Sequence, residues 1–397
     1  MASRAGRVIP CLEATEPERP PPHLSSDLLE EIFLRIGSPA DLARASAACV
    51  SFHRLISDPG FLRRYRSIHP PLLLGLVCKS FEPVEEPHPN APVARALARA
   101  ADFTFDYLPR GRCHLWDVRD GRLLLSCSRE GVKDSFVFPG LAVCDPLSRR
   151  YLLLPPIPDD LVASVHVQEC RIRDFEAFFL PYGRGEQEAS FRVIGVTECD
   201  EKLAVFVFSS ATFGWSIGVS TSWDALTLHP DDFILPWPSC YYSYGCFYWK
   251  VVGQNKLLRL KTNDMEFAIV VLPLDHNFMK SVIVEAGEGR IGMFYGTSNG
   301  NGTSLYYATI QIGGQRTSHW KVENIISLPV GYYSAIITSL EGYIILLSVP
   351  KRDGMPSPYF SLEIKTLKIE RIGRMIHHYG KVYPYFGFPP SMSPRRV

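Results

Sequence analysis

The chain has 397 residues, of which 46% are hydrophobic and 21% charged, so it can bury a large core and is not disordered as a whole. Its formal net charge of +1 gives no electrostatic footprint for nucleic acid or an anionic membrane, and neither is expected as a partner. Residues 1–22 hold a Pro/Glu/Arg-rich run without the apolar segment of a secretory signal, which predicts a disordered tail. No later apolar run reaches the roughly 18 residues of a membrane span. A soluble protein of the cytoplasm, the nucleus or both is therefore expected.

Residues 23–69 carry the start signals of several short helices. Asp27 and Glu30 have the spacing of a capping box, and apolar residues follow them at helical spacing. Ser38 and Asp58, each followed by a proline, predict the starts of two further helices. A helical unit this small is near the lower limit of independent stability, where folding buries only about 60% of the chain's surface.

The first of these helices has more apolar residues than one face can hold. Leu28, Ile32 and Ile36 are predicted to face the unit's own core, which leaves Leu29 and Phe33 without an internal partner. This second apolar face could bind helices of another protein or pack against the rest of the same chain. The spacing alone leaves both interpretations open.

The same residues resemble an F-box, whose usual form is L-P-x-D-L-L-x-E-I-F, then D-L-x-R-A, then V-C-x-x-W. The segment DPGFLRRYRSIHPPLLLG is also similar to the continuation in plant members, especially those of grasses. The chain departs from the pattern at Ser25, Ala48 and Phe52, where an F-box has proline, valine and tryptophan. The matching positions are Leu24, Asp27, Leu28, Leu29, Glu31, Ile32, Phe33, Asp41, Leu42, Arg44, Ala45 and Cys49.

The resemblance implies that this unit binds the Skp adaptor of a cullin-RING ubiquitin ligase and, through it, the cullin and RING subunits. It implies no chemistry on this chain, so no catalytic residue and no cofactor are expected. The three departures keep open a non-degradative scaffold that uses the helices for another purpose. The residues expected at the adaptor surface are Leu24, Leu28, Leu29, Ile32, Phe33, Leu42 and Phe52.

From residue 70 to 388 the sequence changes to short runs of β-branched and aromatic residues separated by Gly, Pro, Asn and Asp. A strand, a polar turn, a second strand and a Leu-Pro exit recur, as in LAVCDPLSRRYLLLPP and LLRLKTNDMEFAIVVLP. Repetition of four-stranded units around a ring protects strand edges without long helices, which favours a β-propeller. Residues 91–101 are the one short helix expected in this region.

This region also resembles the F-box-associated β-propeller domain of plant F-box proteins, through phrases such as FRVIGVTECDEKLAVFVFSS and GRIGMFYG. About six blades fit the length, five or seven stay open, and a pair of β-sandwiches is the structural alternative. The predicted fold class is α+β and multidomain, with a small all-α F-box before an all-β propeller. The predicted boundaries are 1–22 for the tail, 23–69 for the F-box, 70–388 for the propeller and 389–397 for a C-terminal tail.

Two motifs have the letters of catalytic or nucleotide-binding signatures. Gly214–Gly218 reads G-x-S-x-G around Ser216, but VSTSW follows in place of the helix that a nucleophile elbow needs. Gly287–Gly292 reads G-x-G-x-x-G, but IGMFYG continues as a strand where pyrophosphate binding needs a helix N-terminus. Both are predicted to be hairpin segments, and a hydrolase that uses Ser216 is the lesser alternative.

The cysteines and histidines give no metal signature. The ten cysteines have no C-x-x-C spacing, so buried thiols are expected rather than a zinc site or a disulfide scaffold. His377 and His378 lack a nearby cysteine or carboxylate to complete a ligand set, and no metal is expected.

The expected function is that of a substrate receptor, whose β domain holds an unknown target protein near the ubiquitin-conjugating enzyme. Aromatic residues in propeller loops are candidates for target recognition, with packing between blades as the alternative. These candidates are Trp237, Tyr241, Tyr242, Tyr244, Tyr332, Tyr333, His377, His378 and Tyr379.

Overall fold

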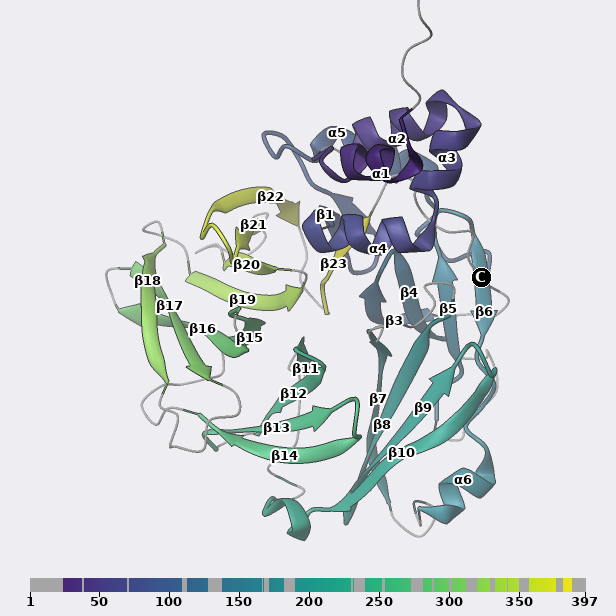
Figure 1. Ribbon diagram of the computed structural model, residues 1–397. Coiled ribbons are helices and arrows are strands. Elements are labelled where there is room, and N and C mark those ends of the chain that lie inside the picture. Colours follow the sequence, from purple (N-terminus) through teal and green to yellow (C-terminus); the bar gives the residue numbers. More distant parts are fainter. Residues whose placement is uncertain are drawn as a thin grey trace, which may run out of the picture.

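The computed structural model describes residues 24–37, 39–69, 71–108, 113–127, 138–165, 167, 171–181, 190–229, 231, 240–251, 254–272, 281–287, 289–299, 302–311, 320–328, 333–340, 342–349, 357–375 and 381–387. It begins with four short helices and continues as a ring of β-sheets (Figure 1). The predicted tails, 1–22 and 389–397, lie outside the described residues.

The N-terminal helical unit consists of α1 (Ser26–Leu34), α2 (Pro39–Ala48), α3 (Val50–Ile56) and α4 (Pro59–Ile68). Side-chain caps start two of these helices. The Ser25 side chain accepts a hydrogen bond from the Leu28 amide (3.3 Å), and Asp58 accepts from the amides of Gly60 (2.8 Å) and Phe61 (3.1 Å). The predicted cap at Asp27 is therefore wrong. Asp27 lies in the first turn of α1, where its negative charge interacts favourably with the positive end of the helix dipole.

The helical unit has a hydrophobic core of its own. Leu42, Ile56 and Tyr65 are fully buried in it, and residues from all four helices contribute. Among the described residues, all members of this cluster lie between Leu29 and Tyr65, within the helical unit. Its buried members are Phe33, Leu34, Leu42, Ile56, Phe61, Leu62 and Tyr65.

The rest of the described chain forms six antiparallel sheets, which are the blades of a six-bladed β-propeller (Figure 1). The expectation of about six blades is confirmed, and the alternative of paired β-sandwiches is wrong. The first blade contains β1 (Leu72–Val77), β2 (Phe81–Pro83) and β23 (Tyr383–Gly387). The second contains β3 (Cys113–Arg119), β4 (Arg122–Cys127), β5 (Leu141–Asp145) and β6 (Arg150–Leu153). The third contains β7 (Ile172–Leu180), β8 (Arg192–Cys199), β9 (Lys202–Ser209) and β10 (Gly214–Ser222).

The remaining three blades repeat the same four-stranded order. The fourth contains β11 (Cys240–Ser243), β12 (Cys246–Lys250), β13 (Lys256–Lys261) and β14 (Glu266–Val271). The fifth contains β15 (Ser281–Glu285), β16 (Arg290–Asn299), β17 (Gly302–Gln311) and β18 (Lys321–Ser327). The sixth contains β19 (Tyr333–Leu340), β20 (Tyr343–Val349), β21 (Ser357–Glu363) and β22 (Ile369–Met375).

The ring is closed by strands from the two ends of the propeller region. β23 pairs antiparallel with β1, with Leu72 opposite Gly387 and Val77 opposite Tyr383. Because the last strand hydrogen-bonds to the first, β1 is paired on both sides and the first blade joins the two ends of the propeller region.

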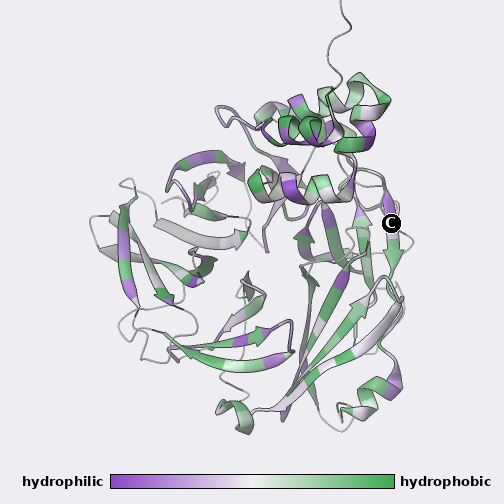
Figure 2. Cartoon of the chain, viewed as in Figure 1, coloured by the Kyte–Doolittle hydropathy of each residue, from purple (hydrophilic) through white to green (hydrophobic). Residues whose placement is uncertain are grey.

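The apolar runs of the sequence become the middle strands of the blades. In β9, Val205 and Phe206 point to opposite faces of the sheet and both are fully buried, because neighbouring blades cover both faces. The outermost strand, β10, has no blade beyond it and is mostly half-buried or exposed. Figure 2 shows hydrophobic residues concentrated along the strands of the ring.

Two helices and one 3-10 turn accompany the sheets. The predicted helix at 91–101 is confirmed as α5 (Ala91–Ala100), which packs against β1 and β2. The helix α6 (Asp159–Ser164) was not predicted, although Asp159 and Asp160 after a proline are a start signal. A 3-10 turn, η1 (Asp224–Leu226), follows β10.

Candidate interaction surfaces

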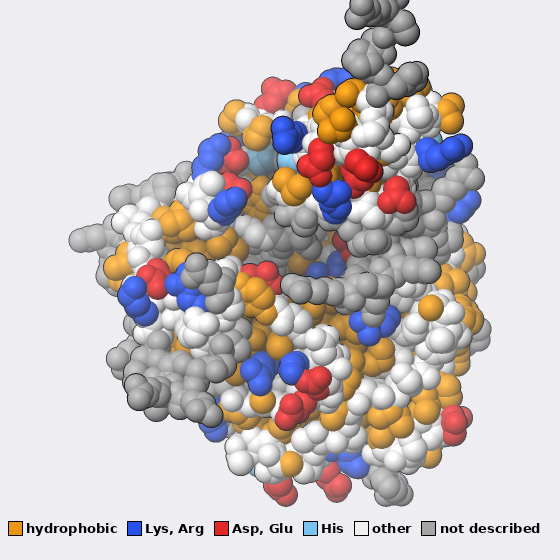
Figure 3. Space-filling model, in the orientation of Figure 1, with side chains coloured by type: hydrophobic (Ala, Val, Ile, Leu, Met, Phe, Trp, Pro, Cys, Tyr) orange, Lys and Arg blue, Asp and Glu red, His pale blue; other side chains and the backbone are white. Residues whose placement is uncertain are grey.

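Three large apolar side chains on α1 and just before it lie in solvent. Leu24, Leu28 and Ile32 are 49%, 54% and 48% exposed, and their spacing of four residues places Leu28 and Ile32 one above the other on the helix. Figure 3 shows hydrophobic side chains gathered on the helical unit, beside acidic and basic ones. We call these three residues the α1 stripe. The three side chains of the α1 stripe are not part of the helical unit's own core.

The prediction of which α1 residues face inward is wrong. Leu28 and Ile32 were expected in the core, whereas Phe33 is buried at 5% exposure and Leu29 packs against the core half-buried. Phe33 packs edge to face against Phe52, with ring centroids 5.0 Å apart, so the larger aromatic side chain takes the inner position. Ile36 also packs against this core, as expected.

The residues expected at an adaptor surface differ in how far the structure exposes them. Leu42 is fully buried, and Phe33 and Phe52 are core contacts, so these three offer little surface to a partner. Of the seven residues expected at the adaptor surface, the α1 stripe is what remains widely exposed.

The C-terminal end of α1 is held by α4 through contacts that the sequence analysis missed. The Tyr65 hydroxyl donates to the Ile36 carbonyl (2.9 Å), and burial raises the pKa of Tyr65 to about 12. His69 Nε2 lies 2.8 Å from the Leu34 carbonyl oxygen and must donate to it, because a carbonyl oxygen only accepts. Arg64 also pairs with Glu30 and Glu31. These contacts fix α1 against α4.

The tyrosines proposed for target recognition occupy different environments. Tyr241 is buried, and its hydroxyl donates to the Ser281 carbonyl (2.9 Å) in the next blade. Tyr242 is half-buried, with the Arg119 guanidinium carbon 5.3 Å from its ring centroid. Both pack inside the ring, which is the alternative stated for these aromatic residues.

The side chain of Tyr244 is exposed, at 37%. It lies in the β11–β12 turn at φ +46°, and its amide donates to Glu285 Oε1 (2.8 Å). Its hydroxyl accepts from the Gly287 amide (2.8 Å), so the ring lies over the neighbouring β15–β16 turn. Tyr333 is the first residue of β19. Trp237, Tyr332, His377, His378 and Tyr379 lie outside the described residues.

A cluster of charged side chains on the innermost strands was also missed. Lys381 Nζ lies 3.3 Å from Glu176 Oε1, and Asp117 Oδ2 accepts from the Phe179 amide (2.9 Å). Burial raises the pKa of Asp117 and of Glu176, and Lys381 opposes the rise in both cases. These residues come from β3, β7 and the segment before β23, near the centre of the ring (Figure 1). The available signal was an acidic residue interrupting the apolar runs HLWDVR and DFEAFFL.

The two signature-like motifs are both hairpin segments, as predicted. Ser216 lies within β10 opposite Val207, and its hydroxyl donates to the Val207 carbonyl (3.3 Å). The strand runs on to Ser222, so the sharp turn and helix of a nucleophile elbow are not formed there. Gly287 and Gly289 have φ of +74° and +71° and connect β15 to the antiparallel β16, without a helix N-terminus.

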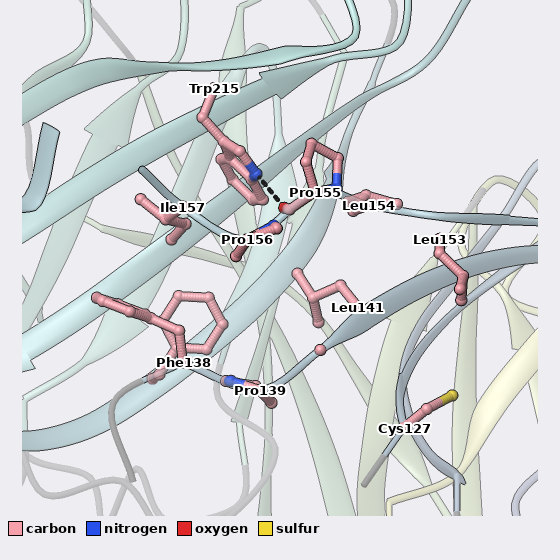
Figure 4. A pocket seen from close by; sticks show the side chains of 12 residues that line it. Cys127, Phe138, Pro139, Leu141, Leu153, Leu154, Pro155, Pro156, Ile157 and Trp215 are labelled. Atoms are coloured by element: carbon pink, nitrogen blue, oxygen red, sulfur yellow. Dashed lines mark hydrogen bonds between the residues drawn. The ribbon is translucent and has the colours of Figure 1, made fainter. Parts of the chain in front are cut away.

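An apolar cavity of about 260 Å³ lies between the second and third blades (Figure 4). Its walls include Phe138, Phe175 and Trp215, and Cys127 lies at its edge. The Trp215 indole donates to the Pro155 carbonyl (2.7 Å), which satisfies the one donor of that ring.

Within the described ranges, no group of three or more His, Cys, Asp and Glu side chains is placed to hold a metal ion. No helix in that same part of the chain is both long and apolar enough to cross a membrane.

The fold defines a six-bladed β-propeller protein with an N-terminal unit of four helices. No protein-family model and no curated protein matches the chain. Among solved structures, it is similar to an exo-β-1,3-galactanase from Phanerochaete chrysosporium with β-1,3-galactotriose, at 11% identity and a TM-score of 0.34, over 68% of this chain and 63% of that one. It is also similar to a chain of a nidogen/laminin complex (9%, TM-score 0.33, 69% and 82%) and to an α-L-arabinofuranosidase from Fusarium graminearum (12%, 0.34, 68% and 83%). The chain thus spans less than two thirds of the galactanase, and likenesses this distant identify neither a family nor a function.

Proposed function

We propose that this chain is a substrate receptor of a Skp–cullin–F-box ubiquitin ligase, of the plant F-box type with an associated propeller. The helical unit binds the Skp adaptor, and the propeller holds a target protein. Ubiquitin transfer takes place on other subunits. The chain acts by proximity, because tethering raises the effective concentration of target lysines near the charged conjugating enzyme.

The α1 stripe is the observation that carries this proposal. Leu24, Leu28 and Ile32 all fall on apolar positions of the F-box pattern, and each leaves about half of its surface in water. Covering such a half-exposed side chain contributes about 1 kcal/mol. A partner that covers all three would gain an apolar contact with Leu28 and Ile32 on one face of α1 and with Leu24 just before the helix, which resembles the helix-in-groove mode of recognition.

The α1–α4 packing supports the same role. Because the core of the unit is complete without the stripe, the stripe can be covered by a partner without unfolding the helices. The departures Ser25 and Phe52 are accommodated inside the unit: Ser25 caps α1, and Phe52 packs against Phe33. Neither substitution removes apolar surface from the stripe.

Co-purification of the full chain with a Skp adaptor tests the proposal. The double variant Leu28→Asp with Ile32→Asp places two charges in the stripe and should abolish co-purification. The matched control is Val322→Asp with Ile325→Asp on β18, since these residues are 48% and 55% exposed on the propeller. The control should bind as the wild type does, and circular dichroism should show that both variants are folded. Adaptor binding by the stripe variant, or equal loss in both variants, would contradict the proposal.

A non-degradative scaffold is the alternative, because the same surfaces could assemble proteins without destroying them. Affinity capture with and without proteasome inhibition separates the two. For a degradative receptor, blocking the proteasome should increase the amount of target captured on the wild-type chain. The same treatment should cause a much smaller increase on the stripe variant. For a scaffold, proteasome inhibition should change the capture of partners on neither the wild-type chain nor the stripe variant.

A further inference from the structure

Two cysteines face each other across the β3–β4 hairpin. Cys113 pairs directly with Cys127 in the antiparallel ladder, and their Sγ atoms lie 2.7 Å apart. Opposed residues in antiparallel strands have Cα atoms about 4.5–5.5 Å apart, within the range that a disulfide needs. Both residues are present as thiols. The two sulfurs are therefore close enough to be joined without a movement of the backbone.

Both sulfurs can be approached by a small reagent. Cys113 is partly exposed. Cys127 is only 5% exposed, but it is one of the residues that line the apolar cavity of about 260 Å³ (Figure 4). The cavity leaves space for Cys127 to change rotamer as a bond forms, and the exposure of Cys113 makes it the first sulfur to react.

A third cysteine nearby does not compete for this pairing. Cys144 lies on β5 in the same hydrophobic cluster, and burial raises the pKa of its thiol to about 12. In the ladder Cys144 lies opposite Leu123 of β4 and Tyr151 of β6, so neither Cys113 nor Cys127 is its cross-strand neighbour. The pair across the hairpin is therefore the one that the ladder brings together.

We propose that Cys113 and Cys127 are a redox modification site that forms a reversible disulfide with a low-molecular-weight disulfide such as oxidised glutathione as oxidant. The Cys113 thiolate attacks one sulfur of oxidised glutathione, forms a mixed disulfide and releases one glutathione thiolate. The Cys127 thiolate then attacks the Cys113 sulfur, and the second glutathione leaves. Two protein thiols lose two electrons and two protons, and one oxidised glutathione becomes two reduced ones. The bond joins the two inner strands of the second blade. The site does not depend on the proposed ligase role.

Peptide mapping of the full-length chain tests this directly. Arg112, Arg119, Arg122 and Arg129 place the two cysteines on separate tryptic peptides, CHLWDVR (113–119) and LLLSCSR (123–129). After treatment with oxidised glutathione, alkylation of the remaining thiols and digestion without reductant, these peptides should appear cross-linked, and dithiothreitol should separate them. Glutathione on the exposed Cys49 shows that the reagent was active. Separate alkylated peptides, or a stable glutathione adduct on Cys113, in a sample with modified Cys49 would overturn the proposal.

Two variants test whether Cys127 is the residue that resolves the mixed disulfide on Cys113. Cys127→Ser should stop the reaction at the mixed disulfide on Cys113, seen as one glutathione added to the 113–119 peptide. Cys144→Ser is the matched control and should form the cross-link as the wild type does. A cross-link lost in Cys144→Ser, or one from Cys113 to Cys144 in the wild type, would contradict the assignment. The wild-type map decides the question if either variant fails to fold.

Discussion

Phe33 and Phe52 pack edge to face inside the helical unit, with ring centroids 5.0 Å apart and an interplanar angle of 74°. An edge-to-face aromatic pair contributes about 0.5–1.5 kcal/mol beyond the area that it buries. The pair also orients α1: with Phe33 inside, Leu28 and Ile32 must face outward. The orientation of this one helix decides which residues can meet a partner.

Phe33→Ala should destabilise the helical unit by about 3–5 kcal/mol, since it removes a buried aromatic and leaves a cavity. Leu28→Ala, on the exposed stripe, should change stability by no more than about 0.5 kcal/mol. Hydrogen exchange of the α1–α4 amides in the full chain measures both. Similar effects of the two substitutions would show that α1 is oriented differently.

Asp58→Ala should loosen α4 by about 1 kcal/mol, because Asp58 accepts hydrogen bonds from the amides of Gly60 and Phe61. Asp58→Asn keeps a side-chain oxygen at the cap and should retain most of the stability. Amide exchange in α4 is the measurement. An asparagine variant as unstable as the alanine variant would argue against the cap.

Much of the fold could be predicted from local sequence. Runs such as LAVFVF are apolar at every position because blades cover both faces of a middle strand, and such a run indicates a strand buried on both faces. The helix at 91–101 and the hairpin interpretation of both glycine motifs were also correct.

The orientation of α1 could not be predicted in the same way. In SDLLEEIFL, the pairs Leu28/Ile32 and Leu29/Phe33 have the same spacing, so periodicity cannot choose between them. The choice depends on Phe52, whose position is known only once the helices are packed. The Glu176–Lys381 pair was missed for a related reason, since 205 residues separate its partners.

Gly75→Ala should destabilise the propeller at its closing seam. A Cβ at Gly75 would lie 2.4 Å from the Glu82 carbonyl oxygen and 2.5 Å from the Phe81 ring, so β1 or β2 must shift, at a cost of about 1–3 kcal/mol. Gly37→Ala is the matched control, because a Cβ there meets nothing within 4 Å. Thermal unfolding followed by near-ultraviolet circular dichroism should show a lower midpoint for Gly75→Ala alone. Equal midpoints would contradict the tight seam.

Stability should fall between pH 4.5 and pH 7 because of Glu198. Its side chain is 10% exposed and 3.5 Å from the Arg173 Nε, and burial raises its pKa from 4.5 to about 7. The folded state therefore binds this proton more tightly than the unfolded chain does. This tighter binding contributes on the order of 3 kcal/mol to the free energy of unfolding. The contribution is fully present below pH 4.5 and is lost as the pH rises through about 7.

Glu198→Gln should flatten this part of the pH profile and raise stability at pH 8 relative to the wild type. Urea unfolding midpoints measured from pH 4.5 to 8 test this, with the exposed Glu266→Gln as control. An unchanged pH slope in Glu198→Gln would assign the titration to another group.

The α1 stripe is the surface that we propose a Skp adaptor covers. Hydrogen exchange of the full chain, with and without saturating adaptor, measures this directly. Exchange should slow in peptides covering residues 24–34 and stay unchanged in β9 and β18 of the propeller. An adaptor that binds while exchange in residues 24–34 is unchanged, or that slows exchange only in the propeller, would contradict the central claim.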